Sequence, residues 1–281
     1  MVRRCRSALA LGALLSALVS VRALSDGPVV VTGATGRTGS LVYNQLKSKN
    51  LPVRALVRNV TKAREYLGCK KCDESEGIFV GDVTEPDSLV APMKGAGSLI
   101  IASSAVPICA KYPDCHFPKG GDPVAVDWIG AKATLAAFAH ATAGTGLGQV
   151  VLISTMGTTS PEDSKDPFGH IGFYKLNFEA ELMASGLPFT IVKPCGLLDT
   201  TPLTMELVVG HDDDLTVNPP TISRADVARV CIAALQQPKV SAGLRFDLCS
   251  KAGTPTSDPD LAKVLQGAKY PWEVNAGEIV V

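Results

Sequence analysis

The sequence predicts an α/β fold with a doubly wound, parallel sheet in a single domain. Short, β-rich apolar runs alternate with longer helical stretches, an alternation that is typical of βαβ units. Several of the runs are continuously apolar, as expected for parallel strands that are covered on both faces. The 281 residues are enough to bury one full core, and no repeat or interdomain linker divides them.

The elements follow one another in a regular order along the chain. The predicted strands are Val29–Thr32, Val53–Val57, Ile78–Val80, Leu99–Ser103, Val150–Ser154, Thr190–Lys193 and Leu244–Leu248. The predicted helices are Thr38–Lys47, Asp87–Met93, Asp127–Thr142, Tyr174–Ala184 and Arg224–Leu235. Two long connections, Val106–Val124 and Thr158–Gly172, leave the carboxyl ends of central strands, where open α/β sheets bind ligands.

The N-terminus does not share this pattern. Three arginines within the first six residues precede the apolar run Ser7–Val21, and Val21–Ala23 resembles a small-residue cleavage site. The apolar run is too short for a comfortable membrane span. We therefore interpret residues 1–23 as an N-terminal signal or targeting segment, with the mature chain starting near Leu24, and assign residues 27–281 to the folded domain.

Such a segment predicts entry into the secretory pathway, toward secretion, the endomembranes or a complex plastid. A retained anchor and an Arg-rich presequence for a plastid or mitochondrion are the alternatives. After removal of the signal, no stretch would form a stable membrane span. The 27 basic and 27 acidic residues cancel, and aromatic residues make up only 5%, which argues against nucleic acid as a partner.

A glycine-rich turn is the most informative motif. Gly33, Gly36 and Gly39 form G-x-x-G-x-x-G directly after the first apolar strand and directly before a helix. Glycines at this turn allow close backbone approach, and the following helix N-terminus stabilises a pyrophosphate. This placement predicts a dinucleotide cofactor, which we expect to contact the turn at Gly33, Thr35, Gly36, Arg37, Thr38 and Gly39.

The end of the second strand predicts which dinucleotide binds. An NAD site requires Asp or Glu about 20 residues after the glycines, to accept a hydrogen bond from the ribose 2′-hydroxyl. Here the strand ends in Arg58, and Arg37 in the turn adds a second cation. Guanidinium groups suit a 2′-phosphate, so the sequence predicts NADP(H).

Further motifs, spread along the chain, resemble one family. They are Gly81–Val83, Ser103–Pro107, Val126–Gly130, Ser154–Gly157, Ser185–Val192 and Ser223–Ala228. Together with the glycine turn they resemble the atypical short-chain dehydrogenases of plants and algae, which are related to NmrA-like NAD(P)-binding Rossmann proteins. The resemblance extends from about Pro28 to Leu265.

The resemblance implies a Rossmann fold and further cofactor contacts. The residues that it places along the cofactor, from adenine to nicotinamide, are Asp82, Val83, Ser103, Ser104, Lys175, Pro194 and Cys195. The first two would face the adenine and the serines the ribose and pyrophosphate. Lys175 would reach the nicotinamide ribose, and the last two residues would border the nicotinamide ring.

Catalysis is where the sequence departs from this family. The ancestral pattern is Tyr-x-x-x-Lys with a serine after the fifth strand, and the tyrosine supplies the proton. Ser154 and Lys175 match the serine and the lysine and are the predicted catalytic residues. Four residues before the lysine, however, stands Ile171, which has no exchangeable proton.

Other proton donors fit less well. Tyr174 is adjacent to the lysine, and adjacent helical side chains point about 100° apart, unless the helix begins only after Gly172. Tyr112, His116 and His170 lie in the two long loops and are conceivable ligand contacts. We expect an NADP(H)-dependent oxidoreductase of unknown small-molecule substrate, with a non-standard acid or none. A non-catalytic NADP(H) sensor, or a regulatory or assembly protein, is the alternative.

The cysteines leave the redox state open. Cys69 and Cys72 form a C-x-x-C pair, and Cys109 and Cys115 lie six positions apart in a loop. Both pairs are compatible with thiols or with small disulfides, whereas a zinc site that adds His116 is disfavoured.

Two remaining features are expected to be structural. Cys231 and Cys249 lie in an apolar helix and strand, where cysteine is typically a small core residue. The run His211–Asp214 is interpreted as a polar turn. No metal site is predicted.

Overall fold

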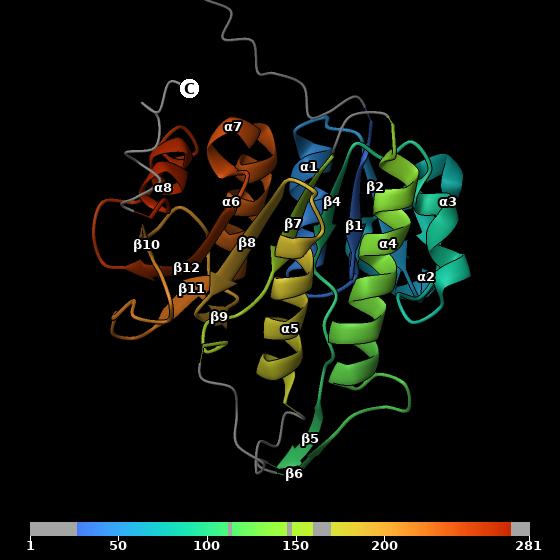
Figure 1. Ribbon diagram of the computed structural model, residues 1–281, viewed down its shortest axis with the longest axis horizontal. Coiled ribbons are helices and arrows are strands. Elements are labelled where there is room, and N and C mark those ends of the chain that lie inside the picture. Colours follow the sequence, from blue (N-terminus) through green and yellow to red (C-terminus); the bar gives the residue numbers. More distant parts are fainter. Residues whose placement is uncertain (1–26, 112–113, 145–147, 160–169, 271–281) are drawn as a thin grey trace, which may run out of the picture.

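The fold is a layered α/β domain, seen in a computed structural model that describes residues 27–111, 114–144, 148–159 and 170–270 (Figure 1). Within these residues, one sheet holds ten strands in the order β3-β2-β1-β4-β7-β8-β12-β11-β9, with β10 added beside β12. The chain runs outward from β1 in one direction to β3, and then from β4 in the other. This order confirms the predicted doubly wound sheet.

The strands of this sheet are β1 (Val29–Thr32), β2 (Val53–Val57), β3 (Ile78–Val80), β4 (Ser98–Ile101), β7 (Gln149–Ile153), β8 (Phe189–Pro194), β9 (Gly196–Leu198), β10 (Glu206–Gly210), β11 (Thr221–Ser223) and β12 (Leu244–Lys251). The seven predicted strand runs are confirmed to within two or three residues at their ends, whereas β9, β10 and β11 were not predicted. Neighbours from β3 through β8 to β12 pair in parallel. The far edge is different, because β10 and β11 run antiparallel to β12, so the sheet is mostly rather than wholly parallel.

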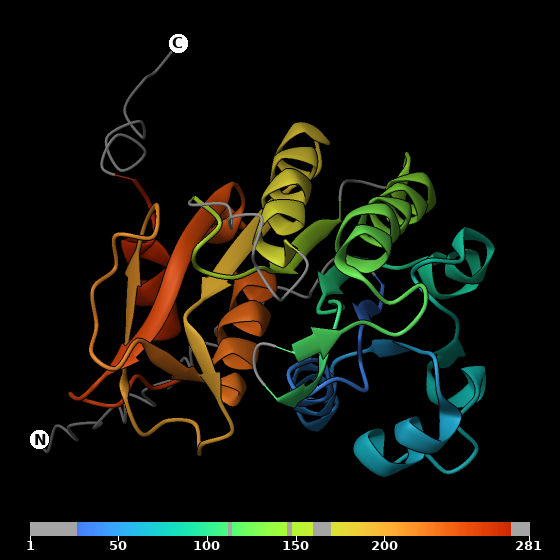
Figure 2. The same cartoon turned by 90° about the horizontal axis from the view of Figure 1, so that it is seen from below.

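Helices cover both faces of the sheet (Figure 2). The α-helices are α1 (Gly39–Ser48), α2 (Val60–Leu67), α3 (Val90–Met93), α4 (Ala131–Thr142), α5 (Ile171–Ala184), α6 (Arg224–Gln236), α7 (Pro238–Ser241) and α8 (Leu261–Gly267). Shorter turns are the 3-10 helices η1 (Glu74–Glu76) and η2 (Pro86–Leu89) and the π-helix η3 (Val124–Gly130). Successive side chains of β1 enter opposite layers: Val29 and Val31 pack in the layer that contains α1 and α6, and Val30 in the layer that contains α4 and α5.

Three elements differ from the expectation in ways that affect the site. The helix expected at Tyr174–Ala184 is α5, which begins at Ile171 instead of Tyr174. The helix expected from Asp127 is a π-helix, η3, that continues into α4. The long loop after β4 contains a hairpin, β5 (Ile108–Lys111) with β6 (Asp114–His116), seen at the lower edge of Figure 1.

The topology indicates where a ligand would bind. β1 lies between β2 and β4, so the chain reverses its direction of winding at the carboxyl ends of β1 and β4. Open α/β sheets bind ligands at this crevice. No helix in the described part of the chain combines the length and apolar character of a membrane span.

Candidate functional site

The glycine turn closes tightly over the end of β1. Gly33 has a φ of +62°, and a Cβ there would lie 2.7 Å from both the Ala102 carbonyl oxygen and the Ser103 amide nitrogen. The Gly36 amide donates to the Gly33 carbonyl at 2.8 Å. Among the described residues, no side-chain bond caps the α1 N-terminus at Thr38. Uncapped helix N–H groups beside a glycine cradle fit a pyrophosphate, as the motif predicts.

The residues predicted for the adenine end lie together. The Asp82 Oδ1 accepts hydrogen bonds from the Thr84 amide and hydroxyl at 3.0 and 2.9 Å. Its Oδ2 lies 3.7 Å from the Arg58 guanidinium, and the Arg58 side chain is 68% exposed. Arg58 is therefore free to turn toward a phosphate. Val83 is buried in a small core cluster with Val126 of η3, so it supports this end from within the fold.

Arg37 of the turn forms an ion pair that the sequence did not indicate. Its guanidinium contacts Asp199, which follows β9 and also pairs with Arg224 at 2.8 Å. The hydrogen bond from Arg37 holds the pKa of Asp199 below its usual value, with Arg224 adding to the effect. Arg37 would have to share or release Asp199 in order to bind a 2′-phosphate.

A cavity of about 620 Å³ opens at the carboxyl ends of the central strands. Its lining joins the glycine turn to the segments after β4, β7 and β8: Thr38, Ala102, Ser104, Ile153, Ser154, Thr155, Met156, Gly157, Ile171, Lys175, Pro194, Cys195, Gly196, Leu197 and Pro220. It includes six of the predicted site residues: Thr38, Ser104, Ser154, Lys175, Pro194 and Cys195. Ser103 is not among the lining residues, and its hydroxyl lies 3.0 Å from that of Thr32.

Lys175 is held by a carboxylate that we did not predict. Its Nζ lies 2.9 Å from Asp127 Oδ1, and the two side chains are 10% and 1% exposed. The Asp127 Oδ2 accepts a hydrogen bond from the Ala105 amide at 2.8 Å, which ties η3 to the segment after β4. Asp127 is the charged residue of the otherwise apolar motif Val126–Gly130, and this isolated charge could have identified it as a site residue. It positions Lys175 at the cavity.

Ser154, the second predicted catalytic residue, is engaged by Glu179. The Ser154 hydroxyl donates to Glu179 Oε1, and Glu179 is fully buried in α5. The other carboxylate oxygen accepts from Arg245 of β12 at 2.8 Å. In this arrangement the serine proton points at a carboxylate, so the hydroxyl can accept a hydrogen bond at the cavity but does not offer its proton there.

The start of α5 determines how Ile171, which stands four residues before Lys175, lies relative to this lysine. Because α5 begins at Ile171, this residue and Lys175 are one helical turn apart, and both line the cavity. Tyr174 instead stacks edge-on against Phe173 and is not among the lining residues. Tyr112 lies outside the described residues. The apolar side chain of Ile171 therefore lines the cavity one helical turn before Lys175.

The run His211–Asp214 is a turn whose side chains diverge. The His211 ring stacks on Tyr270, and Asp212 lies 3.4 Å from Arg245. Asp213 accepts from the amides of Gly157 and Thr159, both at 2.8 Å, and pairs with buried Lys193 at 2.8 Å. Asp213 thus fixes the loop after β7 that forms one cavity wall, a role that sequence analysis missed.

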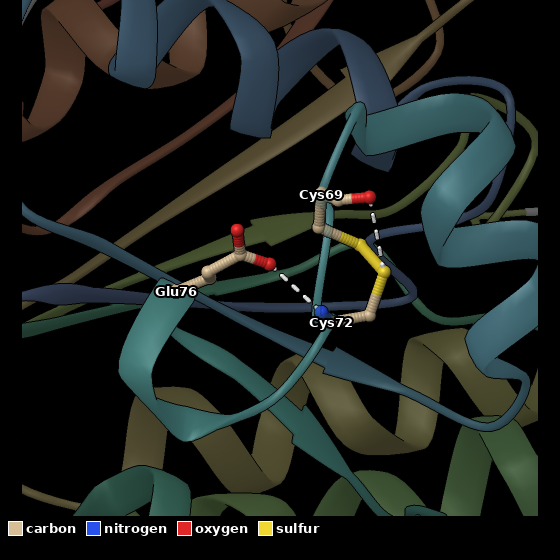
Figure 3. A group of neighbouring side chains, drawn as sticks. All are labelled: Cys69, Cys72 and Glu76. Atoms are coloured by element: carbon tan, nitrogen blue, oxygen red, sulfur yellow. Dashed lines mark hydrogen bonds between the residues drawn. A yellow bond between two sulfur atoms is a disulfide. The ribbon is translucent and has the colours of Figure 1, made fainter.

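The cysteines pair more extensively than expected. Disulfides join Cys69 to Cys72 and Cys109 to Cys115, which resolves the two open cases. In Figure 3 Glu76 points at the first pair, and its carboxylate accepts from the Cys72 amide at 2.7 Å. The bonded sulfurs leave no thiolate pair for a metal at this cluster.

A third disulfide changes the interpretation of two residues. Cys249 is buried, as predicted, but it is bonded to Cys195 rather than acting as a simple core residue. Cys231 of α6 is the free cysteine of the described chain and is fully buried.

Comparison with known proteins identifies the family. A model of an NAD(P)H-binding family matches residues 33–238, from the glycine turn to the end of α6. The chain belongs to this NAD(P)H-binding family. The match confirms the predicted relationship to NmrA-like, atypical short-chain dehydrogenases.

Plant proteins are among the relatives of this NAD(P)H-binding protein. It is 37% identical over 263 residues to an uncharacterised chloroplastic protein of Arabidopsis thaliana, covering 87% of this chain and 77% of the relative. It is 32% identical over 256 residues to sanguinarine reductase of Eschscholzia californica, covering 79% and 89%. A 26% match to the chloroplastic protein TIC 62 of Pisum sativum spans 77% of this chain and 41% of that protein.

Solved structures share the fold. An oxidoreductase from Lactococcus lactis superposes with a TM-score of 0.64 at 18% identity, over 86% of this chain and 99% of its own. A short-chain dehydrogenase/reductase from Veillonella parvula in complex with NADP gives 0.57 at 13% identity, over 83% and 97%. At these identities the similarity supports the Rossmann fold alone.

Proposed function

We propose that this protein binds NADP(H) and acts as an oxidoreductase whose site lacks the usual tyrosine acid. The observation that carries the proposal is the continuity of one groove. It begins at the uncapped N-terminus of α1, passes Ser104, and ends in the cavity where Lys175 is held by buried Asp127. A chain that only kept the fold would have no need of this buried ion pair.

The residues present fit the cofactor, provided that Arg37 shares or releases Asp199. The α1 N–H groups and the glycine turn would hold the pyrophosphate, and Lys175 would hold the nicotinamide ribose. Arg58 and Arg37 would contact the 2′-phosphate through charge-assisted hydrogen bonds. When bound, the cofactor supplies a hydride to, or accepts one from, a substrate in the cavity.

Proton supply limits the reaction. Ile171 offers none, and the Ser154 proton is directed at Glu179. General acid catalysis contributes about 10²–10⁴-fold, so reduction of simple aldehydes, ketones and quinones should be very slow. A relative that carries the name sanguinarine reductase supports reductase chemistry in a site of this family.

Two measurements test the proposal. Calorimetric titration should show NADPH binding, with NADH weaker. The proposal would be rejected if neither NADPH nor NADH binds. NADPH oxidation should then be assayed against generic carbonyl substrates with the natural sequence and with Ile171→Tyr. A rise in rate for the variant supports an enzyme whose acid was lost, whereas fast turnover by the natural sequence would contradict the missing acid.

A second candidate is a non-catalytic NADP(H) sensor. Ile171 and Ser154 favour it, because the first lacks a proton and the second donates its proton to Glu179. Cofactor binding with no turnover on any substrate, before and after Ile171→Tyr, would support this candidate.

We propose a plastid as the compartment, the alternative that the sequence left open. Two of the relatives above carry the description chloroplastic. Residues 1–26, on which the predicted secretory signal depends, lie outside the described residues. N-terminal sequencing of the native protein and imaging of a fluorescent fusion to the full chain would distinguish plastid import from secretion.

A further inference from the structure

Sulfur-containing side chains form part of the cavity wall. Cys195 lines the cavity beside Pro194, and it is bonded to Cys249 of β12. The Sγ of Cys249 lies 3.5 Å from the Sδ of Met156, which also lines the cavity. Three sulfur side chains, from β12 and from the segments after β7 and β8, therefore meet at or directly behind the cavity wall.

This disulfide is not needed to hold its strands together. β8 and β12 already pair in parallel up to Pro194 and Leu248, and the Cys195 amide donates to the Leu248 carbonyl at 3.0 Å. The disulfide therefore cross-links two segments that backbone hydrogen bonds have already joined. Its breakage would leave the sheet paired and would change mainly the cavity wall.

The two sulfurs differ in access. Cys249 is fully buried, whereas Cys195 borders the cavity. Cys195 is 7% exposed and Cys249 0%, so the cavity that Cys195 lines, where the cofactor would bind, is the route by which a reductant reaches the pair. After reduction the sulfurs are no longer bonded and need more room. Because Cys249 is packed in the core, the Cys195 thiol has to turn into the cavity.

We propose that the Cys195–Cys249 disulfide is a redox site that is coupled to cofactor binding. A dithiol reductant opens it through the cavity, bound cofactor shields it, and the opened thiol weakens cofactor binding. The proposal rests on the proposed function, since it requires that a nicotinamide cofactor occupy this cavity.

The exchange is balanced by the dithiol. A thiolate of the reductant attacks Cys195 Sγ, the bond to Cys249 breaks, and Cys249 leaves as a thiolate that takes up a proton. The second thiol of the reductant then attacks the mixed disulfide and releases Cys195 as a thiol. Two electrons pass to the protein pair, and the reductant leaves as a cyclic disulfide.

The first test measures how fast each disulfide opens. The full-length protein is treated with dithiothreitol with and without NADP⁺, quenched with iodoacetamide, and analysed by peptide mass spectrometry. NADP⁺ at ten times its Kd leaves about one molecule in ten free, so Cys195–Cys249 should open about tenfold more slowly. Cys69–Cys72 and Cys109–Cys115 do not line the cavity and serve as internal controls that should not respond.

The second test measures affinity. Cys249→Ser leaves Cys195 unpaired and should raise the Kd for NADP⁺ about fivefold above that of the oxidised protein, as should reduction of the natural protein. Cys231→Ser is the matched control, because burial raises the pKa of that thiol to about 12 and keeps it inert. It should leave the Kd unchanged.

The outcomes are distinguishable. Equal opening rates with and without NADP⁺, or equal Kd values for the oxidised and reduced forms, would overturn the redox proposal while cofactor binding stands. Failure of NADPH, NADH and NADP⁺ to bind either form would instead reject the proposed function. A slower opening together with a raised Kd in Cys249→Ser would support the coupling.

Discussion

The two halves of the sheet build their parts of the site by different means. From β1 to β4 the site is made by local features, namely the backbone of a glycine turn, a helix end without a side-chain cap, and exposed arginine side chains. From β7 to β12 it is made by buried charges from distant segments, such as Glu179 with Arg245 and Lys193 with Asp213 and Asp247. We call the part from β1 to β4 the cofactor half and the part from β7 to β12 the substrate half. The cofactor half depends on local motifs that the sequence predicts, whereas the substrate half depends on pairs between distant residues.

The largest expected effect lies in the substrate half. Glu179→Ala would leave Arg245 without its buried partner and the Ser154 hydroxyl without its acceptor. Removal of one partner of a buried pair costs about 3–5 kcal/mol of unfolding free energy. Urea denaturation should detect this loss.

The control for this change is Glu206→Ala. Glu206 pairs with Lys251 at 3.4 Å on the surface, where the two side chains are 39% and 47% exposed. An exposed pair contributes about 0–1 kcal/mol. Equal losses for Glu179→Ala and Glu206→Ala would show that burial does not strengthen the charge pairs that build this half of the site.

The next largest effect tests the backbone of the cofactor half. Gly33→Ala places a Cβ against the Ala102–Ser103 backbone at a φ of +62°. Left-handed strain of about 1–2 kcal/mol adds to an overpacking cost of about 1–3 kcal/mol, and NADPH binding should be lost. Gly68→Ala is the matched control, since φ is +66° there and nothing lies within 4 Å of the added Cβ.

Only the strain is expected at Gly68, and NADPH affinity should not change. Thermal unfolding and NADPH titration on both variants would decide between them. A Gly33→Ala protein that still binds NADPH would show that close backbone approach is not what holds the pyrophosphate.

A third prediction sharpens the comparison at the exposed edge of the cofactor half. Arg58→Asp should abolish or reverse the preference for NADPH over NADH, because a hydrogen bond to a charged group is worth about 1.5–3 kcal/mol. The fold should be unaffected, since Arg58 is 68% exposed. Calorimetric titration with both cofactors measures the preference, and equal affinities in the natural protein would refute the assignment.

The same contrast explains what the sequence could predict. Gly33, Gly36 and Gly39 act through their own backbone, so spacing alone locates them. The helix α2 was missed although Asn59 caps its start and Gly68 its end, because it is only eight residues long and buries just Ala63 and Leu67. Asp127 and Lys175 are 48 positions apart (175 − 127), and only the folded chain brings them together.

Conversely, two segments were described correctly by their local structure or burial, but their distant partners were not predicted. The polar turn at His211–Asp214 was predicted, but its contact with the loop after β7 joins residues more than 50 positions apart. The Cys195–Cys249 pair spans 54 positions and gave no spacing signal. Periodicity reports local structure and burial, and it does not report which distant charge or thiol a side chain will meet.

The smallest predicted effect concerns pH and lies in that polar turn. Although partial burial tends to raise the pKa of Asp213, hydrogen bonds from Lys193, Thr159 and Gly157 outweigh it and hold the pKa well below its usual value. A carboxylate whose pKa is lowered by folding contributes stability above the unfolded-state pKa of about 3.9, and this stability is lost as the pH falls through the folded-state value. Asp213→Asn should therefore be less stable than the natural protein at neutral pH, and the gap should narrow below about pH 4.

The gap at neutral pH should be about 1 kcal/mol, the difference between a charged and a neutral hydrogen bond. It is small because Lys193 keeps Asp247 as a partner at 3.2 Å, so no buried cation is left alone. Burial raises the pKa of Asp247, so Asp247 stabilises the fold less as the pH rises. This pH dependence is opposite to that of Asp213. Unfolding free energies of both proteins at pH 7, 5 and 3.5 would measure the gap. A constant gap across this range would show that the Asp213 carboxylate does not hold the cavity wall by its charge.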